Sequence, residues 1–167
     1  DRKSLTEALK AGAMVNGAVA CYEPDWPGKL EPVRWVYAEI VRALHEHEKV
    51  EILCHDEQVR DDAWRRLQAH GVRPSRYRLH LCPTDRVWLR DSAPTGVLRG
   101  GRLEWCDWGF NAWAKYDNFT ADAALGPFVE QVTGIARREP QRPDGAGRVV
   151  LEGGGIETDG CGTILVT

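Results

Sequence analysis

Two carboxylates lie beside residues that could build a binding site, and Asp91 is the first. It follows Trp88 in the stretch "DRVWLRDSAP" (85–94), which we expect to lie where a strand passes into a loop. A tryptophan face next to a carboxylate can hold a planar cation through cation–π attraction and charge-assisted hydrogen bonds. The alternative is structural: Trp88 packs in the core, and Asp91 pairs with Arg90 or caps a turn through Ser92.

Glu152 is the second carboxylate. In "VVLEGGGIETDG" (149–160) it ends an apolar run and precedes three glycines, which allow the backbone to turn sharply or to approach a ligand closely. A dinucleotide-binding turn is excluded, because such a turn opens a helix whereas Gly155 leads into a second strand-like run. The remaining alternatives are a ligand site and a tight turn with a solvated glutamate.

The other chemically capable side chains form no recognisable centre. The stretch "EWCDWGFNAWAKYDNF" (104–119), which includes Trp113, is dense in aromatic residues and predicts core or the wall of a pocket. The five histidines lack metal-ligand spacing, and Cys161 has no basic neighbour in the sequence that would activate its thiol. We therefore expect neither a metal nor a cofactor.

The composition narrows the class of protein. At 167 residues the chain has the length of one ordinary domain, and 22 basic against 25 acidic residues leave a net charge of −3, which gives no electrostatic case for nucleic acid. The apolar run at 11–21 is too short to cross a membrane. Five cysteines without a CxxC pair favour reduced thiols and a cytoplasmic protein.

The elements that would position these residues alternate between helix and strand in the first half of the chain. Apolar residues recur at three- and four-residue spacings in 31–48, which predicts a helix, and a second helix is expected over 56–71. Apolar or alternating runs predict strands over 49–55 and 76–83. The order helix, strand, helix, strand predicts an α/β fold with parallel pairing.

The second half predicts a different arrangement. Two alternating runs around Gly100–Gly101 are typical of a hairpin over 93–108. The segment 118–134 is expected to be a helix broken at Gly126–Pro127. The remaining expected elements are a loop and two short strands, over 139–147, 149–152 and 162–167.

Taken together, these stretches resemble the agmatine deiminases, members of the guanidine-modifying superfamily that also includes the bacterial peptidylarginine deiminases. The matching motifs are "DRVWLRDSAP", "WGFNAWAKYDNF" and "VVLEGGGIETDGCGTILVT", together with "WPGKLEPVRW", so the resemblance covers 25–167. Residues 1–24 are an atypical N-terminal segment that does not match the family. Three motifs in the same order are far more specific than any one of them.

The resemblance implies a fold and a reaction. The implied fold is a five-bladed α/β propeller (pentein) built of ββαβ modules, of which this chain resembles roughly the N-terminal half. The implied reaction is hydrolysis of the guanidinium C–N bond of agmatine to N-carbamoylputrescine and ammonia, in putrescine and polyamine biosynthesis.

The resemblance also implies roles for particular residues. Asp91 matches the aspartate that binds the guanidinium, and Glu152 matches a glutamate that helps to bind and polarise it, so these two are the expected catalytic residues. Trp88 matches an aromatic residue that lines the same pocket, and Trp113 falls where relatives contact the far end of the substrate. The expected substrate-binding residues are therefore Trp88, Asp91 and Trp113.

Two family motifs do not occur in the chain: Gly-Gly-Gly-Asn-Ile-His-Cys with the nucleophilic cysteine, and Gly-His-Val-Asp with the general acid/base histidine. We therefore expect the chain alone to be inactive and to pair with the missing C-terminal half or with a second copy. Two alternatives stay open. One is a peptidylarginine or free-arginine deiminase of the same superfamily, and the other is a non-catalytic cation-binding or assembly module, or a truncated gene product.

Overall fold

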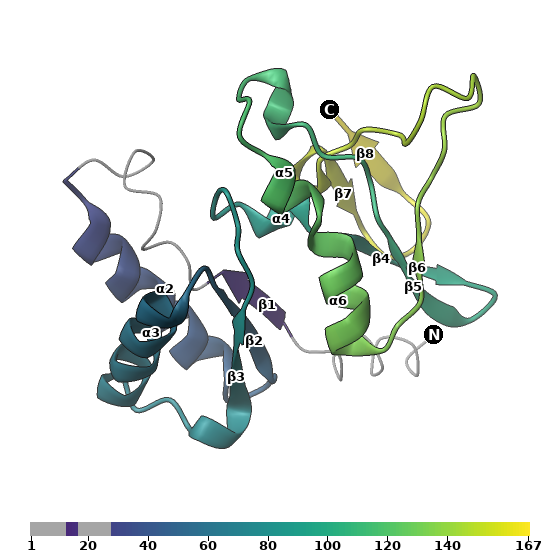
Figure 1. The fold of residues 1–167 in the computed structure, drawn as a ribbon. Coiled ribbons are helices and arrows are strands. Elements are labelled where there is room, and N and C mark those ends of the chain that lie inside the picture. The colour runs from purple at the N-terminus through teal and green to yellow at the C-terminus, as the bar shows by residue number, and fades with distance from the viewer. Residues whose placement is uncertain (1–12, 17–27) are drawn as a thin grey trace. The chain divides into compact units, whose positions relative to one another are not determined.

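The computed structural model describes residues 13–16 and 28–167, and it divides the chain into two compact units, Asp1–Val87 and Trp88–Thr167 (Figure 1). Each unit is described by itself. Most of the predicted segment 1–24 lies outside the described residues.

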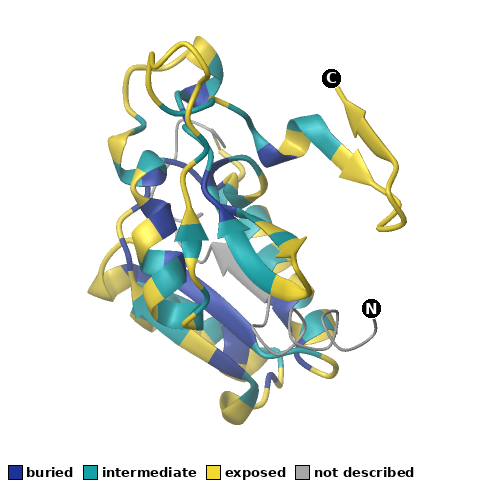
Figure 2. Cartoon of the chain, turned by 90° about the vertical axis from the view of Figure 1, so that its right-hand side faces the viewer, coloured by how far each residue is buried: buried dark blue, intermediate teal, exposed yellow. Residues whose placement is uncertain are grey.

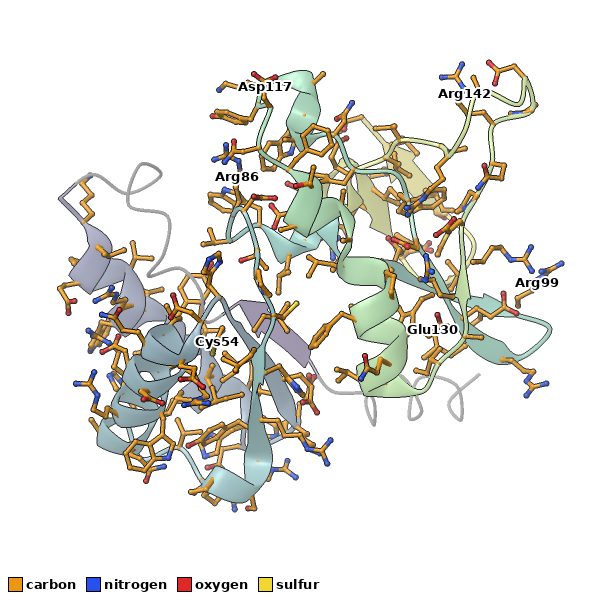
Figure 3. All side chains as sticks on the ribbon, in the orientation of Figure 1. Cys54, Arg86, Arg99, Asp117, Glu130 and Arg142 are labelled. Atoms are coloured by element: carbon orange, nitrogen blue, oxygen red, sulfur yellow. The ribbon has the colours of Figure 1, made fainter. Side chains whose placement is uncertain are left out.

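The first unit is built on a parallel sheet with β2 at its centre, in the order β1-β2-β3. All five residues of β2 are buried, which explains why this strand reads as an unbroken apolar run apart from Glu51. Cys54, labelled in Figure 3, ends β2. The strands and helices of this unit are β1 (Ala13–Asn16), α2 (Leu30–Leu44), β2 (Val50–Cys54), α3 (Glu57–Ala69) and β3 (Tyr77–Leu81), with a 3₁₀ turn at Pro74–Arg76.

The helices and strands of this unit confirm the predicted alternation and the parallel pairing. Helix α3 begins where expected, because the carboxylate of Asp56 accepts a hydrogen bond from the main-chain N–H of Val59 at 2.9 Å. Helix α2 ends at Leu44, four residues before the end predicted at 48. Burial of the apolar face of α2 and α3 against β2 holds the unit together. Its core contains Val41, Val50, Ile52, Cys54, Val59, Leu67, Val72 and Tyr77.

The second unit contains one ββαβ module, in which β4 and β5 pair antiparallel and β5 and β6 pair parallel. The hairpin predicted around Gly100–Gly101 is confirmed. The predicted helix is broken at Ala124, not at Gly126–Pro127. Pro127 lies in the first turn of the second helix, where a main-chain N–H has no helical partner to lose. The elements are β4 (Thr95–Arg99), β5 (Arg102–Cys106), α5 (Thr120–Ala123), α6 (Leu125–Thr133) and β6 (Arg137–Arg138).

A buried ion network holds α6 and β6 to the end of β5. The buried carboxylate of Asp107 lies 2.7 Å from Arg137 and 2.9 Å from Arg148. Glu139 pairs with Arg137 as well. Glu130, labelled on α6 in Figure 3, accepts from the main-chain N–H of Arg137. Buried charged groups stabilise the folded unit only when each of them has a partner of opposite charge.

The rest of the second unit consists of short elements. Two expectations for it are wrong: Asp91 lies in a helical turn and not at the end of a strand, and 149–152 forms no regular strand. The main chain of Val149 and Leu151 instead hydrogen-bonds to Gly109 through a single parallel bridge, and the N–H of Val149 donates to the carbonyl of Pro140. The elements are α4 (Leu89–Ser92), η4 (Ala112–Ala114), η5 (Gly153–Gly155), β7 (Ile156–Thr158) and β8 (Ile164–Val166), with β7 and β8 antiparallel and β8 exposed along its length (Figure 2).

None of the helices in the described ranges is both long and apolar enough to cross a membrane.

Candidate functional site

Asp91 is positioned by α4. The carbonyl of Trp88 accepts hydrogen bonds from the main-chain N–H groups of Asp91, at 3.0 Å, and Ser92, at 3.2 Å. The turn ends at Ala93, which is extended and precedes Pro94, as is usual for a residue before proline. Trp88 thus contributes its main chain to the turn that carries Asp91, while its side chain remains 43% exposed.

The glycine run after Glu152 reaches this carboxylate. The main-chain N–H of Gly154 donates to Oδ1 of Asp91 at 2.8 Å. A Cβ on Gly154 would lie 2.2 Å from the same oxygen, and a Cβ on Gly153 would lie 2.2 Å from the carbonyl oxygen of Arg90. Both distances are far below van der Waals contact, so η5 can lie against α4 only because these two residues lack side chains.

Trp113 supplies the second donor. Its indole Nε1–H donates to Oδ2 of Asp91 at 3.2 Å. The indole is held edge-on by two other rings, Phe110 with a centroid separation of 5.3 Å and Tyr116 with 6.2 Å. Aromatic pairs prefer such edge-to-face geometry, which fixes the direction of the N–H.

The carboxylate of Asp91 therefore receives one N–H on each oxygen, from two segments that lie on either side of it. A carboxylate has about four lone-pair sites, so two anchors leave acceptor capacity for a further donor group. A planar cation with several N–H groups is the kind of ligand that uses such capacity best.

Glu152 is connected to the site by the two glycines that follow it in the chain. It immediately precedes Gly153 and Gly154, which pack on α4, and its side chain is half-buried. Within the part of the chain that the structure describes, its carboxylate makes no hydrogen bond or ion pair. The three predicted motifs thus meet at Asp91, although the Glu152 carboxylate itself is joined to Asp91 only through the main chain.

The sequence alone missed the roles of four residues at this site: Gly154 as a donor, Phe110 and Tyr116 as supports of Trp113, and Asn111. The Oδ1 atom of Asn111 accepts from the main-chain N–H of Ala114 at 3.0 Å. A signal for Gly154 existed, because three consecutive glycines predict a close approach of the backbone. The group approached is the carboxylate of Asp91 and not a ligand.

The other candidates for chemistry are weaker. Burial, with the Asp107 carboxylate nearby, raises the pKa of the Cys106 thiol above its usual range, which disfavours a thiolate there. Among the described residues, no three His, Cys, Asp or Glu side chains gather as a metal site would require. A polar cavity of about 550 Å³ lies beside α3 in the first unit, but Asp56 there caps the helix and Asp62 pairs with Arg65 and Arg66.

Comparison with known families places the chain in one of them. Residues 18–167 match the family model of the Porphyromonas-type peptidyl-arginine deiminases. The chain belongs to this family. Asp91, Trp113 and Glu152 all lie within the matched residues.

Curated relatives and solved structures agree with this placement. The agmatine deiminases of Ectopseudomonas mendocina and of Pseudomonas aeruginosa (strain LESB58) are each 30% identical to this chain over 86% of its length. Agmatine deiminase structures from Enterococcus faecalis (TM-score 0.73, 21% identity, 95% of this chain and 41% of that one) and from C. jejuni with substrate bound (0.70, 21%, 94% and 44%) share its fold. The chain spans about 38% of the length of the curated relatives it matches.

Proposed function

We propose that this chain is the guanidinium-binding part of an agmatine deiminase, with Asp91 and Glu152 as the acidic residues that hold the substrate and Trp88 as an aromatic wall of the pocket. The observation that supports this best is the pair of hydrogen bonds from Gly154 and Trp113, which anchor both oxygens of Asp91. An anchored carboxylate accepts a guanidinium without first rearranging.

The chemistry explains why carboxylates are needed. A guanidinium is planar, delocalised and always charged, so its carbon resists attack by a nucleophile. Carboxylates at its edge fix its orientation and hold the positive charge at the carbon that reacts. In the net reaction, water adds to that carbon and one C–N bond breaks, which leaves the ureido product N-carbamoylputrescine and releases ammonia.

This chain carries the binding residues of that reaction but not its nucleophile. The cysteine and histidine motifs that the resemblance implies are not in the sequence, so turnover requires residues that the chain does not supply. We therefore infer that the chain binds agmatine without converting it, and that a C-terminal half completes the site.

We also infer that the two units belong to a five-bladed propeller of ββαβ modules. The order β4-β5-α6-β6, with one antiparallel and one parallel pairing, has the connectivity of one such module. The hairpin β7–β8 resembles the first two strands of another. The four described cysteines are free thiols, in keeping with a reducing cytoplasm.

Calorimetry with the purified chain tests the proposal. Agmatine should bind, and Asp91→Asn should weaken binding about tenfold or more, because it removes the charge that pairs with the guanidinium. Putrescine, which has the amine but no guanidinium, should not bind. The matched control is Asp144→Asn, an exposed aspartate in the loop after β6 that should leave affinity unchanged.

Three results would count against the proposal: equal binding of agmatine and putrescine, unchanged affinity in Asp91→Asn, or no binding by wild-type chain that circular dichroism shows to be folded. Tighter binding of arginine or of an arginyl peptide than of agmatine would move the assignment to the peptidylarginine branch of the family.

A further inference from the structure

The segment Ala112–Trp113–Ala114 has an uncommon backbone conformation. All three residues have positive φ, at 50°, 59° and 52°, and none of them is glycine. A left-handed conformation costs a residue with a side chain about 1–2 kcal/mol, and it normally occurs singly. Three in succession persist only where the surrounding contacts impose them, and such strain clusters at functional sites.

The contacts that impose this conformation come from both sides of the segment. Asn111 accepts from the N–H of Ala114, which closes the turn. Ala112 is fully buried, so the start of the turn is packed in place. The strained turn is therefore held as a rigid unit and not as a loose loop.

The consequence of the turn is the placement of one N–H group. Phe110 and Tyr116 hold the indole edge-on, and its Nε1–H donates to Oδ2 of Asp91, 22 residues earlier in the chain. The indole nitrogen is a donor only, so it cannot exchange this role with the carboxylate. The opposite oxygen is already bound by Gly154, so the carboxylate plane is set from two directions.

We propose that Trp113 is a positioning residue, which acts on the substrate through the carboxylate of Asp91 and not by contacting the far end of the substrate, and that the left-handed turn at 112–114 exists to aim its N–H. The role in binding rests on the proposed function. The hydrogen bond itself can be tested without any ligand, so the two ideas fail separately.

The ligand-free test uses the indole N–H signals in a ¹H–¹⁵N spectrum of the chain. Trp113→Phe keeps an aromatic ring but removes the N–H, so the signal that disappears belongs to Trp113. In Asp91→Ala that signal should move upfield, because its acceptor is gone, while the signal of Trp105, which donates to Thr133, should stay in place. An unmoved Trp113 signal would overturn the proposal.

The ligand test compares agmatine with methylguanidine, which has the guanidinium but no amine tail. If Trp113 acts through Asp91, Trp113→Phe weakens both ligands by the same factor, about tenfold for a hydrogen bond to a charged group. If it contacts the far end of the substrate, only agmatine is weakened, and the proposal is wrong. Titrations followed by the same spectra measure both affinities, including weak ones.

A wild-type chain that binds neither ligand would contradict the proposed function, while the Trp113 signal in Asp91→Ala would still decide whether Trp113 positions Asp91. Should Trp113→Phe fail to fold, Asn111→Ala provides a second variant. It removes the side-chain acceptor of the Ala114 N–H without touching Asp91, while the main-chain carbonyl of residue 111 still accepts from that N–H. It should shift the Trp113 signal and weaken both ligands together. Loss of agmatine binding alone in this variant would overturn the proposal.

Discussion

The main-chain N–H of Gly154 donates a hydrogen bond of 2.8 Å to the carboxylate of Asp91, which lies 63 residues earlier in the chain. The contact joins the two acidic motifs of the sequence, because Gly154 follows Glu152 by two positions. It also explains the glycine run, since any side chain at Gly154 would overlap Asp91.

Gly154→Ala should abolish guanidinium binding. Its Cβ would lie 2.2 Å from Oδ1 of Asp91, so the main chain must retreat and the hydrogen bond is lost. The matched control is Gly155→Ala, where the nearest atom to the new Cβ is the Thr167 hydroxyl oxygen at 3.4 Å. Calorimetry with agmatine should show at least a tenfold difference between the two variants, as expected for a lost hydrogen bond to a charged group. Equal affinities would contradict this account of η5.

Ala114→Gly should stabilise the second unit while weakening agmatine binding. Glycine removes the left-handed strain at φ 52°, which raises the unfolding free energy by about 1–2 kcal/mol. It also raises the conformational entropy of the unfolded chain, which lowers the unfolding free energy by about 0.5–1 kcal/mol. The net gain in unfolding free energy is about 0.5–1 kcal/mol, measured by urea denaturation. The control, Ala124→Gly, has an ordinary φ of −95° and should destabilise. A loss of stability in Ala114→Gly would show that the turn is not strained.

Asp107→Asn should destabilise the second unit by about 1.5–3 kcal/mol, because Arg137 and Arg148 lose their shared buried counter-charge and keep only more exposed partners such as Glu139. The same change at Asp144, whose ion pair with Arg142 is exposed and screened by solvent, should cost far less. Urea midpoints measure both. Similar losses in the two variants would mean that the Asp107 network is not a structural centre of this unit.

The first unit should lose stability in acid through Glu39. Its hydrogen bonds with the Arg42 guanidinium and with His70 lower the pKa of its carboxyl from 4.5 to about 2. Because the folded-state pKa is depressed, the stabilisation is present above pH 4.5 and is lost as the pH falls toward 2. Glu39→Gln should therefore show a smaller fall in Tm over this interval than wild type. A Glu39→Gln profile that matches wild type would contradict the assignment.

Much of the first unit could be predicted because its patterns are local. Helix spacing over 31–48 and the apolar run at 49–55 each reflect which side of a single element is buried. The short elements of the second unit could not be predicted in this way. Residues 85–94 read as a strand end because Val87 and Leu89 flank Trp88, yet Leu89–Ser92 is a helical turn.

By itself, the sequence determined the family, because the motifs at Asp91, Trp113 and Glu152 depend on residue type and order alone. Only the tertiary structure decided how these motifs act on one another. The hydrogen bonds from the Trp113 indole N–H and from the Gly154 main-chain N–H to Asp91 join residues 22 and 63 positions apart. No local pattern encodes such contacts, since they form only when separate segments pack against one another.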